Sequence, residues 1–274
     1  MIEFRSISKT FPDGTTAVDE FSFVLPSHQT TVFVGSSGCG KTTLLRMINR
    51  MVDASSGDLE IDGENISTIE PVKLRRRIGY VMQNSGLLPH RRVIDNIATV
   101  PRLNGVPKKE AHARALELMD TVGLDRGMAE RYPAQLSGGQ QQRVGVARGL
   151  AVDPNILLMD EPFGAVDPIV RADLQQELLR LQRELDKTVV FVTHDIDEAF
   201  LLGDQVVILE KGARIAQKGS PEEILANPAS DFVASFIGAD RGKRALSIRE
   251  VDGSSILVDG DGNVAGALTE EGTA

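Results

Sequence analysis

The stretch Gly35-Ser36-Ser37-Gly38-Cys39-Gly40-Lys41-Thr42 decides the fold, because it is a complete phosphate-binding loop of the form G-x-x-x-x-G-K-[ST]. A continuous apolar run at residues 30–34 precedes the loop and is typical of a buried strand. Residues 42–51 follow it with Leu, Ile and Met at helical spacing. This order of strand, loop and helix is the context that the motif requires, and it predicts an α/β fold.

The phosphate loop itself predicts a nucleotide site. Its backbone N–H groups and the start of the following helix form a cradle for anions. We expect Lys41 to reach the β- and γ-phosphates and the hydroxyl of Thr42 to bind Mg²⁺. Cys39 is the only cysteine, so no internal disulfide is possible and a reducing compartment is expected. Because the nucleophile in such sites is water, we interpret Cys39 as a spacer.

A second glycine-containing stretch, Leu136-Ser137-Gly138-Gly139-Gln140, follows about 100 residues later. Its glycine pair leaves exposed backbone without side chains. A chain with both surfaces is expected to close on a nucleotide together with a second copy of itself or with a partner.

Length and charge limit the possible functions. The 274 residues, 41% of them hydrophobic, suffice for one large α/β domain with an appendage. A net charge of −9 argues against general nucleic-acid binding, so we interpret the basic run at residues 73–77 as a solvated helix face. The sequence shows neither a signal peptide nor a run of 18 apolar residues. If the protein powers transport, the channel is therefore expected to be another polypeptide.

Periodicity predicts the remaining organisation. Strands are expected at residues 2–8, 21–25, 78–82, 156–159 and 189–192. Hairpins are expected at residues 59–66, with an Asp-Gly turn, and at 205–217. From about residue 87 to 149 the strand signal fades, which predicts an inserted helical subdomain that includes an amphipathic helix at 108–122. Ser220-Pro221-Glu222-Glu223 predicts a capped helix start. The composition shifts after about Asp240, so we expect a domain at 1–240 and a tail at 241–274.

Polar residues follow three of the predicted strands. Asp160 and Glu161 end the run at 156–159, where parallel sheets bind their ligands. We expect Asp160 to hold Mg²⁺ and Glu161 to orient or deprotonate the attacking water; the alternative is a strand-ending turn closed by Pro162. His194 follows the strand at 189–192 and is expected to donate a hydrogen bond to the γ-phosphate. Gln83 follows 78–82 and could reach both Mg²⁺ and the water.

The tail contains Asp259-Gly260-Asp261-Gly262-Asn263, which partly resembles a calcium loop. Val264 stands where such a loop has Gly, and no helices are expected on either side. A hairpin that joins residues 256–258 to Val264 through Asp-Gly turns is therefore favoured over a calcium site.

Together, the motifs stand in the order found in the ATP-binding-cassette (ABC) ATPases, and the sequence resembles that family over residues 1–240. The resemblance implies a RecA-like P-loop NTPase core with an antiparallel β part and an inserted helical subdomain. It also implies a head-to-tail dimer that binds ATP and Mg²⁺ between two chains. Phe11 falls where the family has an aromatic residue that stacks on adenine. Asp167, in Gly164-Ala165-Val166-Asp167, matches a loop that crosses the dimer interface, although the family more often has Ser-Ala-Leu-Asp there.

The site residues implied in this way fall into three groups. The catalytic group comprises Glu161, His194 and Gln83, and the metal-binding group comprises Thr42, Gln83 and Asp160. The ATP-binding group comprises Phe11, Gly35, Ser36, Ser37, Gly38, Cys39, Gly40, Lys41, Thr42, Thr43, Ser137, Gly138, Gly139, Gln140 and Asp167.

A closer resemblance is to importers of glycine betaine, carnitine and choline, carried by residues 83–90, 160–168, 191–199 and 231–241. It implies an ATPase on the cytoplasmic face of the membrane that powers a permease, with a second ATPase subunit, expected to form a homodimer, and indirectly a solute-binding protein. The alternatives are a soluble ABC ATPase that is not coupled to transport, an importer of a different solute such as an amino acid, and a nucleotide sensor.

The same importers often carry a pair of cystathionine-β-synthase (CBS) modules after the ATPase domain. Only 34 residues follow Asp240, and Ile256 to Leu268 resembles one hairpin of such a module. A truncated remnant is the hypothesis, and it gives little basis for regulation of transport by ionic strength or nucleotide through this tail.

Overall fold

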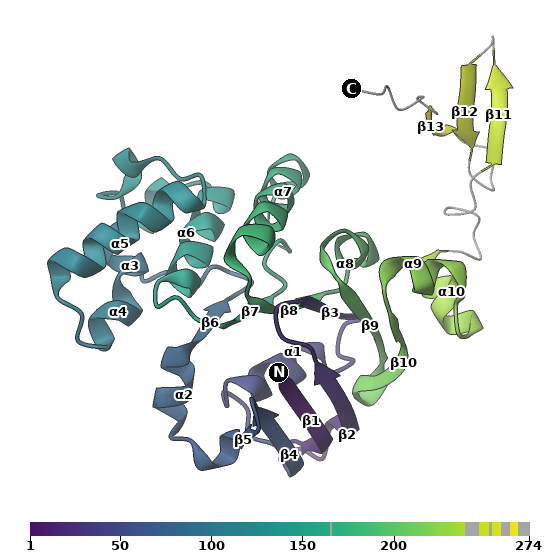
Figure 1. Ribbon diagram of the computed structural model, residues 1–274, viewed down its shortest axis with the longest axis horizontal. Coiled ribbons are helices and arrows are strands. Elements are labelled where there is room, and N and C mark those ends of the chain that lie inside the picture. Colours follow the sequence, from purple (N-terminus) through teal and green to yellow (C-terminus); the bar gives the residue numbers. More distant parts are fainter. Residues whose placement is uncertain (165, 239–246, 252–253, 259–263, 268–274) are drawn as a thin grey trace.

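The computed structural model describes residues 1–164, 166–238, 247–251, 254–258 and 264–267 (Figure 1). A six-stranded sheet in the order β10-β9-β3-β8-β7-β6 forms the centre. Its strands are β3 (Thr30–Gly35), β6 (Ile78–Val81), β7 (Ile156–Asp160), β8 (Thr188–Thr193), β9 (Gln205–Glu210) and β10 (Arg214–Gly219). All neighbours are parallel except β9 and β10, which form the hairpin predicted at 205–217.

An antiparallel sheet in the order β2-β1-β4-β5 packs below the central sheet in Figure 1. It consists of β1 (Ile2–Thr10), β2 (Thr16–Leu25), β4 (Ser56–Ile61) and β5 (Glu64–Asn65). The turn between β4 and β5 contains Asp62 and Gly63, both at positive φ, which confirms the predicted Asp-Gly hairpin.

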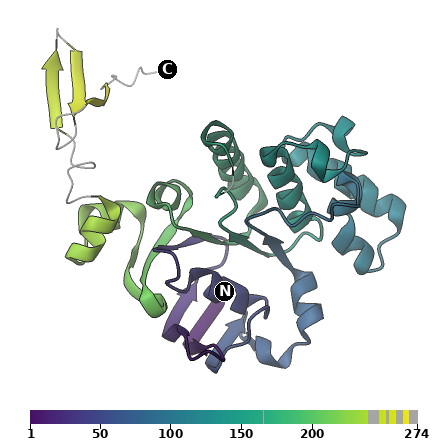
Figure 2. The same ribbon diagram turned by 180° about the vertical axis from the view of Figure 1, so that it is seen from behind.

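The helices are α1 (Lys41–Ile48), α2 (Pro71–Arg77), α3 (Val93–Ile97), α4 (Thr99–Leu103), α5 (Lys108–Thr121), α6 (Gly138–Leu150), α7 (Pro168–Leu185), α8 (Ile196–Leu202), α9 (Pro221–Ala226) and α10 (Asp231–Ile237). Short 3₁₀ turns lie at Ile66–Thr68, Arg126–Met128, Pro133–Gln135 and Lys211–Ala213. Between β6 and β7 every regular element is helical, and these helices extend beyond the β6 edge of the sheet in both views (Figures 1 and 2). Among the described residues, no helix is both long and apolar enough to cross a bilayer.

Two apolar clusters hold the layers together, one on each face of the central sheet. Alternate residues of the parallel strands point to opposite faces. Val32 and Phe191 pack with α6, α7 and α8, whereas Phe33 and Val190 pack with α1 and the antiparallel sheet. Every residue of β3, β7 and β8 is buried, as expected for parallel strands that are covered on both faces.

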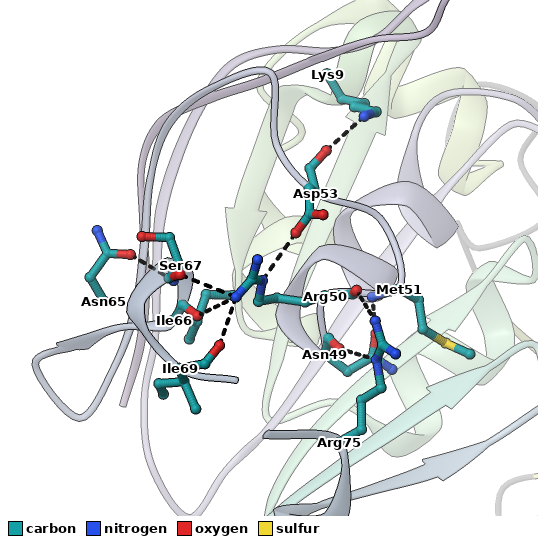
Figure 3. Close-up of polar contacts among 10 residues, drawn as sticks. All are labelled: Lys9, Asn49, Arg50, Met51, Asp53, Asn65, Ile66, Ser67, Ile69 and Arg75. Atoms are coloured by element: carbon teal, nitrogen blue, oxygen red, sulfur yellow. Dashed lines mark hydrogen bonds and ion pairs between the residues drawn. The ribbon is translucent and has the colours of Figure 1, made fainter. Parts of the chain in front are cut away.

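The helix that follows the phosphate loop ends earlier than the sequence predicts, at Ile48 instead of Met51. Arg50 adopts a positive φ of 55°, which stops the helix, and Arg75 of α2 donates hydrogen bonds to the last carbonyls, those of Asn49 and Arg50 (Figure 3). Arg50 in turn donates to three carbonyls before α2, those of Ile66, Ser67 and Ile69. Two arginines therefore fasten the end of α1 to the segment that leads into β6.

Three tail strands, β11 (Ser247–Val251), β12 (Ser254–Val258) and β13 (Val264–Ala267), form a sheet of their own. Val258 pairs with Val264, so the predicted hairpin between these residues is confirmed. The Asp-Gly turns predicted at residues 259–263 and the domain boundary at Asp240 lie outside the described residues.

Phe33 joins the two sheets, since its ring lies 6.0 Å from Phe21 and 6.2 Å from Phe23 and is fully buried. Replacing it with alanine should lower the free energy of unfolding by about 3 to 5 kcal/mol, because the ring leaves a cavity between the sheets. Val24→Ala on exposed β2 surface should change it by no more than about 0.5 kcal/mol. Urea denaturation measures both, and equal effects would contradict the packing described.

Candidate nucleotide site

The phosphate loop runs from the end of β3 to the first residue of α1. Gly40 has a φ of 114°, and a Cβ atom there would overlap the carbonyl oxygen of Ala17. Only glycine satisfies both constraints. Lys41 is 4% exposed, and its ammonium donates to the carbonyls of Gly35 at 2.7 Å and Ser36 at 2.9 Å. The cation is therefore held inside the loop, where an anion in the cradle would meet it.

Asp160 lies at the carboxyl end of β7 and is 5% exposed. Its Oδ1 accepts a hydrogen bond of 2.9 Å from the hydroxyl of Thr42, so the two predicted magnesium ligands are adjacent although 118 residues separate them. A hydroxyl and a carboxylate are hard oxygen donors of the kind that Mg²⁺ prefers. This pair fits the ion chemically.

The second oxygen of Asp160 has partners that sequence reasoning missed. Oδ2 accepts a hydrogen bond from the Tyr80 hydroxyl at 3.0 Å and another from Arg46 at 3.2 Å. Arg46 lies one helical turn after Thr42 on α1, so this spacing could have predicted that both side chains face Asp160. Tyr80 reaches Asp160 only because β6 and β7 are neighbours, so the sequence alone gives no signal for it.

Tyr80 loses its proton only at unusually high pH in this environment. Burial raises the pKa of Tyr80 to about 12, and the neighbouring charge of Asp160 acts in the same direction, whereas Arg46 acts against both. The hydroxyl therefore stays protonated and remains a donor to Asp160 at physiological pH.

Glu161 follows Asp160 directly and has a positive φ of 44°, which is unfavourable for a residue with a side chain. Its N–H donates to the carbonyl of Val192 on β8 at 2.9 Å, which holds the backbone in place. The Oε2 atom lies 3.1 Å from His194 Nδ1. The structure thus brings together the predicted base and the predicted histidine from the ends of two adjacent strands.

Gln83 lies beside the same pair. A Cβ atom on Gly164 would lie 3.3 Å from Gln83 Nε2 and 3.7 Å from Glu161 Oε2. Both side chains therefore converge on the bare backbone of Gly164, and the three predicted catalytic residues occupy one region.

The stretch at 136–140 begins α6. Ser137 caps this helix: its Oγ accepts the N–H of Gln140 at 3.3 Å, and Gln140 Oε1 accepts the N–H of Ser137 at 2.9 Å. A Cβ atom on Gly139 would overlap Val170 of α7, so glycine permits this helix contact. Within the described part of the chain, no hydrogen bond joins residues 136–140 to residues 35–43.

Two further predicted residues lie at the margins of this region. Phe11 is half-buried in the turn between β1 and β2, with the ammonium of Lys9 5.4 Å from its ring centroid. Asp167 is exposed just before α7, and its carbonyl accepts the N–H of Arg171 at 2.8 Å. Stacking on adenine and contact across a dimer remain predictions for these two residues.

Comparison with known proteins identifies the family. The family model described as "ABC transporter" matches residues 18–164. A glycine betaine uptake system ATP-binding protein of Escherichia coli is 49% identical over 252 residues, which cover 92% of this chain and 81% of the relative. The chain belongs to the ABC transporter family.

Other relatives of this ABC cassette are longer. A glycine betaine/carnitine/choline transport ATP-binding protein of Bacillus subtilis is 51% identical over 241 residues, 88% of this chain and 63% of the relative. The chain therefore spans less than two thirds of that protein. Among solved structures, a dimeric ABC transporter cassette is 32% identical with a TM-score of 0.73, covering 81% of this chain and 99% of that one. The predicted fold class, an α/β P-loop NTPase core with an antiparallel β part, is confirmed.

The Tyr80 contact can be tested with alkali. Because an unfolded phenol ionises near pH 10 and Tyr80 near 12, its contribution to stability is fully present below about pH 10 and lost as pH rises towards 12. After a stopped-flow jump to about pH 11, Tyr80 should give its phenolate absorbance only as the protein unfolds. Tyr80→Phe should keep the prompt absorbance change and lose part of the slow one. Loss of prompt absorbance in this variant would contradict the buried contact.

Proposed function

We propose that this chain binds ATP with Mg²⁺, hydrolyses the ATP in a head-to-tail dimer, and thereby powers a separate permease that imports a quaternary-amine osmoprotectant. The observation that carries the hydrolytic part is the 3.1 Å contact between Glu161 and His194, beside Gln83 and Asp160. A base, an orienting imidazole and an amide at one sheet edge suit the activation of a water molecule.

The chemistry is positioning and electrostatics. Lys41 and the loop N–H groups would hold the phosphates. Thr42 and Asp160 would hold Mg²⁺, and the ion would supply positive charge that offsets the charge of the phosphates. Glu161 accepts the proton of the attacking water. His194 keeps Nδ1 towards Glu161, which leaves Nε2 to face a phosphate oxygen. Gln83 reaches the same water through its amide.

The partner chain would complete the site. The backbone N–H groups of Gly138 and Gly139 begin α6, and a helix N-terminus suits a phosphate oxygen. Gly138 is exposed, whereas Gly139 is buried, contrary to the expectation of an exposed glycine pair. The related solved cassette is a dimer, and a second structure of the same protein is a dimer in a post-hydrolysis state with ADP and phosphate bound. Both structures support the proposal that two copies of this chain share each nucleotide site.

The permease and the solute are inferred from relatives and from one surface. The names of the Bacillus and Escherichia relatives specify glycine betaine, carnitine and choline, at 49–51% identity. A groove of about 380 Å³ beside the loop from Gln83 to Pro89 is lined by Leu88, Leu103 and cationic side chains that include Arg91 and Arg102. This groove suits a cytoplasmic segment of a permease, and movement of the loop would transmit closure of the dimer. We also propose that the hairpin of β12 and β13 is similar to a hairpin of a CBS module.

Glu161→Gln should bind ATP, dimerise and hydrolyse ATP about 100-fold more slowly, because the amide cannot take the proton. Sedimentation with ATP and a phosphate-release assay measure the two effects. Glu184→Gln, which alters an exposed ion pair with Arg180, is the matched control and should behave as wild type. Wild-type hydrolysis by Glu161→Gln would remove Glu161 as the base.

Uptake tests the transport function. Cells that lack this gene and redundant importers should take up labelled glycine betaine, carnitine or choline at high osmolarity when complemented with wild type or with Lys218→Ala on the exposed surface. Lys41→Ala, expressed to the same level, should fail because the phosphate cradle loses its cation. Uptake that is unchanged in all strains would remove the osmoprotectant from the proposal and leave the ATPase.

A further inference from the structure

Glu198 is a buried carboxylate that the hydrolytic scheme does not use. It lies on α8, is 6% exposed, and burial raises its pKa. Its Oε2 accepts a 2.6 Å hydrogen bond from the hydroxyl of Thr193, and its Oε1 accepts one of 3.1 Å from Gln175 of α7. Burying a carboxylate is costly unless it is hydrogen-bonded, and here each oxygen of the carboxylate has a donor.

The hydroxyl of Thr193 connects Glu198 to the residue before His194. While it donates to Glu198, it accepts the N–H of Asp195 at 3.0 Å. The carboxylate of Asp195 in turn accepts the N–H of Asp197 at 2.8 Å and caps α8. Both neighbours of His194 are thus fixed, while the imidazole itself remains more than half exposed and projects towards Glu161.

Helix α7 holds the other side of Glu198. Arg171 Nε lies 3.9 Å from Glu198 Oε1, and Arg171 Nη1 lies 3.8 Å from Asp195 Oδ2. Gln175 donates to Glu198 from the next turn of the same helix. Since Asp167 directly precedes α7, the network joins the predicted interface loop to the turn that carries His194.

We propose that Glu198 is a positioning residue: through the hydroxyl of Thr193 it fixes the turn that presents His194 to Glu161. The inference rests on the proposed role of His194 in hydrolysis. Glu198 acts through Thr193: while the hydroxyl of Thr193 donates to Glu198, one of its lone pairs accepts the N–H of Asp195.

Thr193→Val removes the hydroxyl while keeping the shape of the side chain. The N–H of Asp195 then loses its acceptor and Glu198 loses a donor, so the turn is free to shift. Small displacements of a group at a reacting centre lower the reaction rate by up to about 100-fold. We therefore expect kcat to fall about tenfold, with the KM for ATP unchanged. Thr193→Ser restores the hydroxyl and should restore most of kcat.

Thr188→Val is the matched control. Thr188 stands at the opposite end of β8, is equally buried, and its hydroxyl accepts the N–H of His28 at 3.0 Å. This variant loses a similar hydrogen bond on the same strand, away from His194. It should retain kcat, so that any effect specific to Thr193→Val is separated from a loss of stability.

The imidazole of His194 gives a readout that does not depend on hydrolysis. With histidine labelled at ¹³Cε1, the His194 resonance is assigned by its loss in His194→Ala. Thr193→Val should shift or broaden it, and Thr188→Val and Thr193→Ser should not. If Thr193→Val does not fold, Glu198→Met, which keeps the length of the side chain and removes the acceptor, carries the same two measurements with the same expected changes.

The outcomes are distinct. An unchanged His194 resonance together with unchanged kcat in Thr193→Val overturns the positioning role. Equal losses in Thr193→Val and Thr188→Val also overturn it, since they reveal a general structural effect. A wild-type protein that releases no phosphate, combined with a His194 resonance that responds only to Thr193→Val, retains the positioning role and removes the proposed hydrolysis.

Discussion

The alignment of three buried parallel strands sets the positions of the phosphate loop, Glu161 and His194. Val34 of β3 is level with Thr193 of β8, and Asp160 of β7 is level with Val192. The next residues along these strands are Gly35, His194 and Glu161, so the phosphate loop, the histidine and the proposed base leave the sheet at one edge. A slip of one residue would turn each side chain to the opposite face and separate the groups.

The central sheet offsets the cost of the strained backbone and of the buried charged groups at this edge. Glu161 adopts a positive φ that costs about 1 to 3 kcal/mol, and its N–H is held by β8. Lys41 and Asp160 are both almost fully buried charged groups, and each is surrounded by hydrogen-bond partners. Such preorganised groups stabilise developing charge without having to move during reaction. The site therefore uses stability of the core to fix its geometry.

The sequence predicted the parts of the site that are local in the chain. The phosphate loop, the Asp160–Glu161 pair and His194 each follow an apolar strand, so pattern and position coincide. It could not predict that Tyr80 and Arg46 share one oxygen of Asp160, because that contact requires the order of strands in the sheet. Glu198 was missed for a related reason: it lies only 5 residues after Thr193 in the sequence, but its contact with Gln175 depends on the position of α7. The end of α1 was misjudged because Arg50 adopts a positive φ, which the apolar spacing of the helix does not indicate.

Within the described residues of one chain, no hydrogen bond joins the phosphate loop to the stretch at 136–140. The proposed site shared between two chains would account for both motifs. Mixing two inactive variants tests this most directly. Lys41→Ala lacks the cation that would bind the phosphates. Gly138→Asp places a negative carboxylate at the start of α6, where it would repel a phosphate. In a head-to-tail dimer, one site of each mixed pair carries both lesions and the other carries neither, so phosphate release should recover to roughly a quarter of wild type for independent sites. Recovery no greater than the sum of the two variants alone would contradict a site shared between chains.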